Sequence, residues 1–178
     1  MQTDHDATSK RAIIDTFHEL FLNDKFDQVR IGQIISQADV GRTTFYEYFR
    51  NKEDLFRQAC QPIVIKLAQT PFPEYSEQIL CGLLEHFREV GGTALATLQS
   101  PRADAIVHML AEETLSLVNR HGIAVHRHVT ERSFVCLQIA EFTIGSVRAW
   151  LLSGVDLPSQ ALARNQREIA ERLLDQLR

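Results

Sequence analysis

The chain has 178 residues, 19 basic and 23 acidic side chains, a formal net charge of −4 and a hydrophobic share of 44%. This length suits one domain, or one domain with a small appendage, and the hydrophobic share excludes a disordered chain. The balance of charge excludes a basic protein that coats nucleic acid without sequence preference. Three cysteines without CxxC spacing argue against a disulfide framework or a zinc ribbon. The acidic, polar first residues and the lack of an unbroken apolar run of membrane length predict a cytoplasmic protein with no membrane partner.

Helical periodicity runs through nearly the whole chain and predicts an all-α fold of about nine helices, four before residues 70–73 and five after them. In chain order, the first four include residues 13–21, 31–38, 42–49 and 52–68, with breaks at Asn23-Asp24-Lys25 and Asp39-Val40-Gly41. Pro62 should kink or restart the fourth helix, and Thr70-Pro71-Phe72-Pro73 is the clearest boundary in the chain. The most pronounced later helices cover residues 76–90, 101–120, 133–152 and 162–177, and Gly91-Gly92 is expected to end the first of these.

Residues 29–55 have the pattern of a helix-turn-helix, in which two short helices are joined by a tight turn. Asp39 can adopt the positive φ that such a turn needs, and Gly41 is an acceptable N-cap for the next helix. Phe45 and Phe49 lie four residues apart and should face the core. The opposite face then carries Arg42, Thr43, Tyr46 and Glu47, whose groups include donors suited to base edges and phosphates. Ordinary helical cores show the same spacing, so the pattern alone leaves that alternative open.

This segment resembles the DNA-binding segment of the tetracycline-repressor (TetR/AcrR) family of bacterial regulators. The residues at the family's characteristic positions are Thr44-Phe45-Tyr46, Phe49, Lys52-Glu53 and Leu55. The close match extends over about 45 residues, from Arg11 to Leu55, and the rest of the chain agrees only in length and helical pattern. Asp39 and Gly41 are mild departures from the family's residues, Tyr48 replaces a frequent His, and Arg30 replaces a common Thr.

The resemblance implies specific roles in DNA binding for seven residues. Base or groove contacts are expected from Arg42, Thr43 and Tyr46. Phosphate contacts are expected from Arg30, Thr44, Tyr48 and Lys52, where Lys52 benefits from its place at a helix N-terminus. A packed core aromatic is the alternative for Tyr48.

The resemblance also implies a division of labour between two parts of the chain. Residues 1–55 would form the helix-turn-helix head, joined by a connecting helix at 52–70 to an effector-binding and dimerisation body at 71–178. The implied function is a repressor released from a palindromic double-stranded DNA operator by a small-molecule effector of unknown identity. An activator with the same fold is one alternative, and a helical ligand-binding or enzymatic bundle with a non-functional head is another.

Two further sites are expected in the body. Polar residues beside apolar stripes predict an effector pocket, lined by His86, Phe87, His108, Met109 and Trp150. Apolar stripes on the last two helices predict a homodimer interface made by Ile144, Val147, Leu151, Ile169, Leu173 and Leu177.

Enzyme and metal sites are not expected. The sequence has no GxSxG, P-loop, HExxH or GxGxxG motif, and no Glu-x-x-His pair of the kind that di-iron carboxylate bundles use. His121, His126 and His128 gather around one helix joint, where a solvated loop is favoured over a metal site. We therefore expect a non-enzymatic protein without cofactor or metal.

Overall fold

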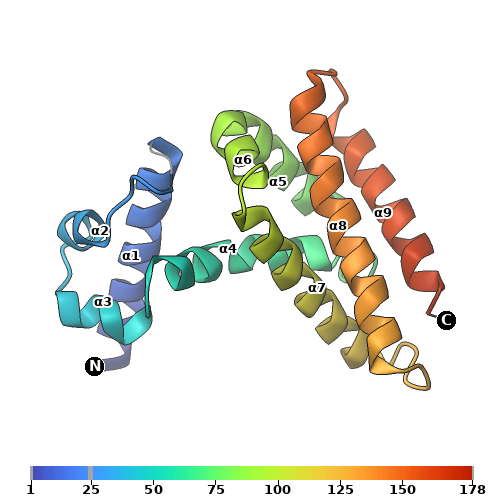
Figure 1. Cartoon of the computed structure of the whole chain (residues 1–178), viewed down its shortest axis with the longest axis horizontal. Coiled ribbons are helices and arrows are strands. Elements are labelled where there is room, and N and C mark those ends of the chain that lie inside the picture. The colour runs from blue at the N-terminus through green and yellow to red at the C-terminus, as the bar shows by residue number, and fades with distance from the viewer. Residues whose placement is uncertain (1, 24–25, 178) are drawn as a thin grey trace. The chain divides into compact units, whose positions relative to one another are not determined.

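The computed structural model describes the backbone of residues 2–23 and 26–177, and the side chains of residues 8–22 and 26–177. Within these ranges the chain forms nine helices and no strand (Figure 1). Four helices precede the proline-containing segment 70–73 and five follow it, which confirms the predicted all-α fold. The predicted break after the first helix falls partly on Asp24 and Lys25, which lie outside the described residues.

The chain divides into two compact units, residues 1–60 and residues 61–178, and the division falls within the fourth helix. The first unit, called the head below, contains α1 (Gln2–Asn23), α2 (Ile31–Gln37), α3 (Arg42–Tyr48) and the start of α4 (Lys52–Ala68). The second unit is called the body. Pro62 is exposed and lies inside α4, which continues as one helix, so the predicted restart does not occur.

Aromatic rings form the core of the head. Phe17, Phe21, Phe26 and Phe56 come from α1, the segment after it and α4, and their ring centroids lie 5.5 to 6.2 Å apart. Such pairs contribute about 0.5–1.5 kcal/mol each beyond the area that they bury. The rings therefore hold the first turns of α4 firmly against α1.

The α3–α4 junction is fixed by reciprocal capping. The Asn51 side chain accepts a hydrogen bond of 2.8 Å from the Asp54 backbone N–H, and the Asp54 carboxylate accepts one of 2.9 Å from the Arg50 backbone N–H. The Arg50 N–H is the main reason that the pKa of Asp54 lies below its usual value. Gln58 adds bonds of 3.2 Å to the Tyr48 carbonyl and to the Asp54 carboxylate. The end of α3 is thus fastened to the start of α4.

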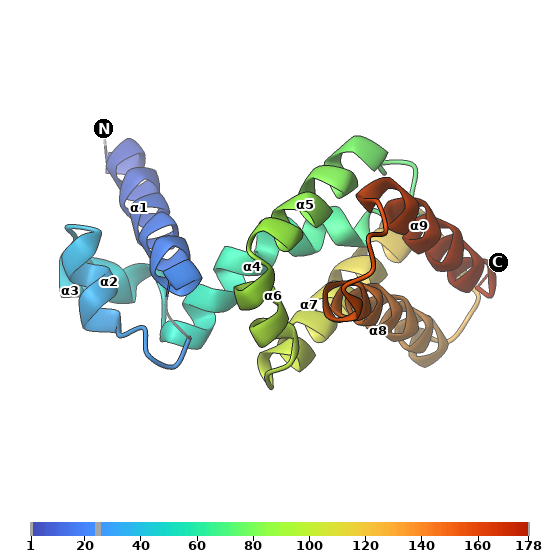
Figure 2. The same cartoon turned by 90° about the horizontal axis from the view of Figure 1, so that it is seen from above.

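The body contains five helices: α5 (Glu77–Glu89), α6 (Gly91–Leu98), α7 (Arg102–Arg120), α8 (Val129–Ser153) and α9 (Ser159–Asp175). The helix α8 packs against α6, α7 and α9, and α9 also packs against α5 (Figure 2). Several helix boundaries differ from the sequence prediction, and α9, for example, begins three residues before the predicted 162. Gly91 begins α6 instead of only ending α5, and α8 begins four residues before the predicted 133.

The helix α8 is the only one in the described ranges with the length and apolar composition of a membrane span. Within the body, 44% of its most apolar window is buried against the neighbouring helices. The central helix of a bundle has the same length and composition, so α8 by itself is weak evidence for a membrane span.

Candidate nucleic-acid interface

The turn between α2 and α3 has the backbone geometry expected for a helix-turn-helix. Asp39 has a φ of 51°, a left-handed conformation that Asp tolerates better than most residues. The turn is closed by a hydrogen bond of 3.2 Å from the Val40 N–H to the Ile35 carbonyl. Gly41 then starts α3 as its N-cap with an extended backbone, φ −72°. The predicted roles of Asp39 and Gly41 are confirmed.

One face of α3 holds the helix in the head and the other is open. The side chains of Phe45 and Phe49 have no exposed surface, and neither has that of Ile34 in α2. The opposite face carries the exposed side chains of Arg42, Thr43, Tyr46 and Glu47. The structure therefore brings together the three residues predicted to meet base edges and leaves them available to a groove.

Arg42 lies against an aromatic ring on this open face. Its guanidinium carbon is 5.7 Å from the centre of the Tyr46 ring, which in turn lies edge-on to Phe45 at 5.3 Å. A guanidinium at this distance is attracted by the face of the ring. Since Phe45 is buried, its contact with Tyr46 gives the Arg42 side chain a fixed support and restricts its conformations.

The residues predicted to hold phosphates are placed less uniformly. Arg30 is exposed and is the N-cap residue of α2, with an extended backbone. Thr44 and Tyr48 are half-buried. The Tyr48 ring lies 6.3 Å from the Phe49 ring, so it retains some surface while packing on the core, and both roles considered for it stay predictions.

Lys52 makes contacts that the sequence did not suggest. Its ammonium Nζ donates hydrogen bonds of 2.8 Å to the backbone carbonyls of Phe26 and Val29. The same Nζ lies 4.3 Å from the centre of the Phe26 ring. Both carbonyls lie more than 20 residues upstream in the sequence, and no local pattern could have indicated them.

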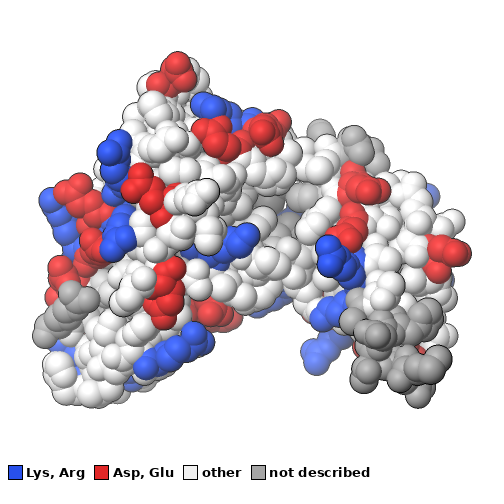
Figure 3. All heavy atoms as spheres, turned by 180° about the vertical axis from the view of Figure 1, so that it is seen from behind, with Lys and Arg blue, Asp and Glu red and all other residues white. Residues whose placement is uncertain are grey.

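Charge on the surface is mixed in sign. Figure 3 shows acidic and basic side chains interspersed over the face that it presents, in keeping with the net charge of −4. The face in Figure 3 therefore shows no wide basic field of the kind that attracts DNA over a distance.

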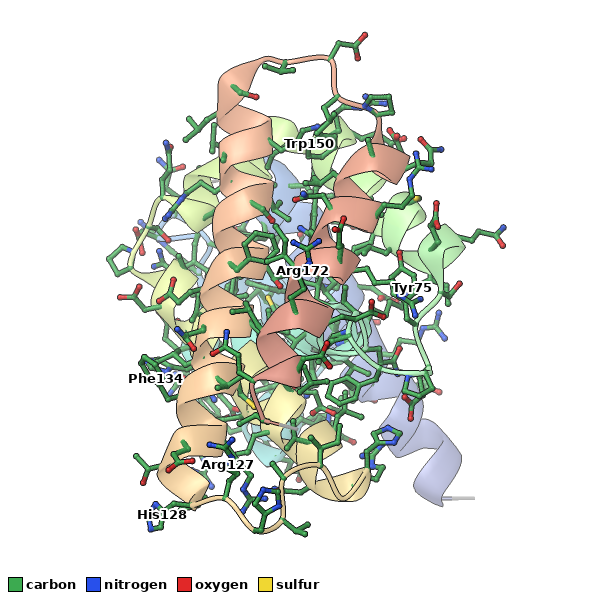
Figure 4. All side chains as sticks on the ribbon, turned by 90° about the vertical axis from the view of Figure 1, so that its right-hand side faces the viewer. Tyr75, Arg127, His128, Phe134, Trp150 and Arg172 are labelled. Carbon is green, nitrogen blue, oxygen red and sulfur yellow. The ribbon has the colours of Figure 1, made fainter. Side chains whose placement is uncertain are left out.

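The five residues predicted to line an effector pocket in the body separate into two groups. Met109 and Trp150 are buried and Phe87 is half-buried, whereas His86 and His108 are exposed. The indole N–H of Trp150 donates to the Leu157 carbonyl at 3.0 Å, which ties α8 to the segment before α9 (Figure 4). His86 lies 4.0 Å from Glu89 on the surface of α5.

The six residues predicted for the dimer interface also separate by burial. Ile144, Val147 and Leu177 are 5%, 1% and 2% exposed in a single chain, so they have almost no surface to lose to a partner. Leu151, Ile169 and Leu173 are half-buried. The exposed apolar residues of α8 are Val129, Phe134 and Leu152, with Phe134 58% exposed (Figure 4). Sequence reasoning missed Phe134 and Leu152 because the polar residues Glu141 and Arg148 share their face of α8.

His121 of the body, Cys60 of the head and Cys136 of the body have structural surroundings. His121 Nε2 lies 2.9 Å from a Glu74 carboxylate oxygen and its ring stacks on Phe72. No group of three or more His, Cys, Asp or Glu residues in the described part of the chain is placed to hold a metal ion. Burial raises the pKa of the Cys60 and Cys136 thiols to about 12, which keeps them protonated at neutral pH.

Comparisons with known proteins give a match for the head. Residues 13–59 match the family model described as bacterial regulatory proteins, tetR family. This range includes all of α2 and α3, the turn between them and the first turns of α4. No curated protein matches the sequence of the chain.

Solved structures extend the likeness to the whole chain. A TetR transcriptional regulator from Streptococcus agalactiae is 22% identical with a TM-score of 0.60, and the alignment covers 96% of this chain and 98% of that one. The TetR family repressor AlkX from a Dietzia strain is 17% identical with a TM-score of 0.56, covering 93% and 95%. The dihydroxyacetone kinase operon activator DhaS is 20% identical with a TM-score of 0.52, covering 95% and 96%. At these identities the likeness shows a shared fold.

Proposed function

We propose that the chain is a DNA-binding transcriptional regulator of the TetR family, whose model its head matches, and that it is a repressor that binds a palindromic operator as a homodimer. The observation that carries the proposal is the open face of α3. Arg42, Thr43 and Tyr46 are exposed there while Phe45 and Phe49 anchor the same helix in the head. A short helix held in this way can present side chains to base edges in a major groove.

We propose that the contacts divide by chemistry. Arg42, Thr43 and Tyr46 read base edges, because guanidinium, methyl and hydroxyl groups can each discriminate between base pairs. Arg30, Thr44 and Tyr48 hold phosphates and fix the register without reading sequence. Lys52 is also predicted to hold a phosphate, and its ammonium donates hydrogen bonds to two backbone carbonyls within the head.

The homodimer would form through the outer faces of α8 and α9. Phe134 and Leu152 are 58% and 54% exposed, and a twofold partner that covers them would remove this apolar surface from water. Sedimentation at micromolar concentration should show about twice the chain mass of 20.3 kDa. Phe134→Glu should shift the protein toward a single chain, whereas Val125→Glu, at an exposed loop position, should not. A single-chain species in the unmodified protein would contradict the dimer.

An effector site in the body remains part of the proposal. Of the predicted residues, Met109 and Trp150 are buried and Phe87 is half-buried, so these three would meet an apolar ligand, and the exposed His86 and His108 would contribute only at its edge. A ligand can release DNA only if it binds the DNA-free state more tightly. A small-molecule screen by thermal shift tests this, since a true effector raises the melting temperature and weakens operator binding together.

Activation is a second candidate, and one observation favours it. A structure with the same fold, DhaS, is named an operon activator, whereas AlkX is named a repressor. We place repression first because occupying an operator needs only the DNA-binding head. Reporter transcription from the operator, measured with and without the protein, shows whether the protein lowers or raises transcription.

Selection from random duplexes tests DNA binding itself. We expect a palindromic consensus whose half-sites lie about one helical turn apart or slightly more. Failure to enrich any consensus would favour the alternative class, a helical ligand-binding or enzymatic bundle with a non-functional head. The cytoplasm, where bacterial operators lie, is the proposed location.

A further inference from the structure

The Lys52 ammonium contacts one turn of the head, residues 26–29, in three ways. The carbonyls of Phe26 and Val29 both accept from it at 2.8 Å, and the Phe26 ring face lies 4.3 Å away. The side chains of Phe26 and Val29 are 5% and 1% exposed, so the turn is also anchored by its apolar residues. Hydrogen bonds from a charged donor are stronger than those between neutral groups. Lys52 therefore fixes the backbone of residues 26–29 to the first turn of α4.

This turn leads directly into a predicted DNA contact. Arg30 follows Val29, and its carbonyl accepts from the Gln33 and Ile34 backbone N–H groups at 3.0 and 3.1 Å, which begins α2. The Arg30 side chain is exposed at that helix start. A shift of the Val29 backbone would therefore displace Arg30 and the first turn of α2 together.

We propose that Lys52 is a positioning residue for DNA binding, which acts by holding residues 26–29 so that Arg30 can meet a phosphate. The inference rests on the proposed function. The competing explanation is that Lys52 itself holds a phosphate, independently of Arg30. The two explanations differ in whether the effects of the two side chains are additive.

The salt dependence of operator binding separates them. Binding weakens as salt rises, and we call the magnitude of the negative slope of log K against log salt the slope. Each lost phosphate contact lowers this magnitude by about 0.9, and a homodimer repeats every contact, so the change is about 1.8 per substitution. We expect Arg30→Ala to lower the slope by that amount and Lys52→Met to lower it by a similar or smaller amount. The double variant should match Arg30→Ala alone. Lys66→Met, at an exposed position later in α4, is the control for removing one lysine.

Two results would overturn the proposal. A double variant whose slope falls by a further amount of about 1.8 would show an independent phosphate contact of Lys52. A Lys52→Met variant with unchanged slope and affinity would show that the Lys52 contacts do not serve DNA binding, even if the variant is less stable.

Hydrogen exchange in the free protein tests the positioning without DNA. Lys52→Met should speed exchange of the Gln33 and Ile34 amides, while the Phe45 and Phe49 amides of α3 keep their rates. Lys52→Gln keeps a neutral N–H donor group, should give an intermediate effect, and replaces Lys52→Met if that variant does not fold. Unchanged exchange at Gln33 and Ile34 would refute the positioning. If the unmodified protein binds no duplex, the proposed function fails while this result still decides the role of Lys52.

Discussion

Replacing Arg42 by alanine should reduce operator affinity selectively, because Arg42 is the side chain on α3 best suited to read a guanine. The exposed guanidinium lies 5.7 Å from the Tyr46 ring and at the open face of the helix. Its removal should change the free energy of unfolding by no more than about 0.5 kcal/mol, as is usual for surface substitutions. The fold of the head should therefore survive, and any large effect belongs to DNA binding.

The expected loss can be estimated from the contact and the symmetry. A bidentate contact of Arg with guanine contributes about 1–3 kcal/mol of discrimination. Two half-sites double this to about 2–6 kcal/mol, which corresponds to a loss of roughly 30-fold to 10⁴-fold in affinity. On a scrambled duplex the same substitution should cost much less, because only a general cation is lost.

Binding of the unmodified protein and of Arg42→Ala is measured by fluorescence anisotropy on the selected operator and on a scrambled duplex. The control is Arg11→Ala, which removes one exposed cation from α1 of the same head. Arg11→Ala should weaken both duplexes equally, whereas Arg42→Ala should weaken the operator more. Equal losses for Arg42→Ala on the two duplexes would refute its assignment as a base-reading residue.

Three further substitutions and one chemical treatment test the local structure within each unit. Asn51→Ala should cost about 1 kcal/mol in a denaturant titration, because it removes an N-cap acceptor. The folded-state pKa of Asp54 is lowered, so the stability that its carboxylate contributes is present above the unfolded pKa of about 3.9 and is lost as pH falls through the folded pKa. Asp54→Asn should therefore make the free energy of unfolding depend less on pH in this acid range. Gln166→Glu would bury a carboxylate at a position with 0% exposure, so its melting temperature should fall more at pH 8 than at pH 5. At pH 8 iodoacetamide should not modify Cys60 or Cys136 in the folded protein, because their thiol pKa of about 12 keeps them protonated, and should modify both after unfolding.

Features of the head that depend on neighbouring residues could be predicted from the sequence. Asp39 takes the positive φ expected of it, and Asn51 and Asp54 form a capping pair three residues apart, since caps and turns are determined within a few residues. The inward direction of Phe45 and Phe49 likewise follows from their four-residue spacing.

Features that depend on tertiary packing could not be predicted in the same way. Lys52 has the composition and place of a phosphate ligand, yet its ammonium meets two carbonyls contributed by a distant turn. Ile144 and Val147 form an apolar stripe that could equally face a partner or the chain's own body, and the packing of α7 and α9 around α8 buries them. Periodicity identifies an apolar face but does not say which surface covers it.

The position of Trp150 gives the protein a built-in optical probe. It is the only tryptophan in the sequence, is 8% exposed and is hydrogen-bonded to Leu157 beside the α8–α9 connection. Tryptophan fluorescence, excited at the red edge of protein absorbance, therefore reports on the body alone. Circular dichroism reports on the helices of both the head and the body. Recording both signals during one melt would show whether the two compact units lose their structure in a single cooperative transition or one after the other.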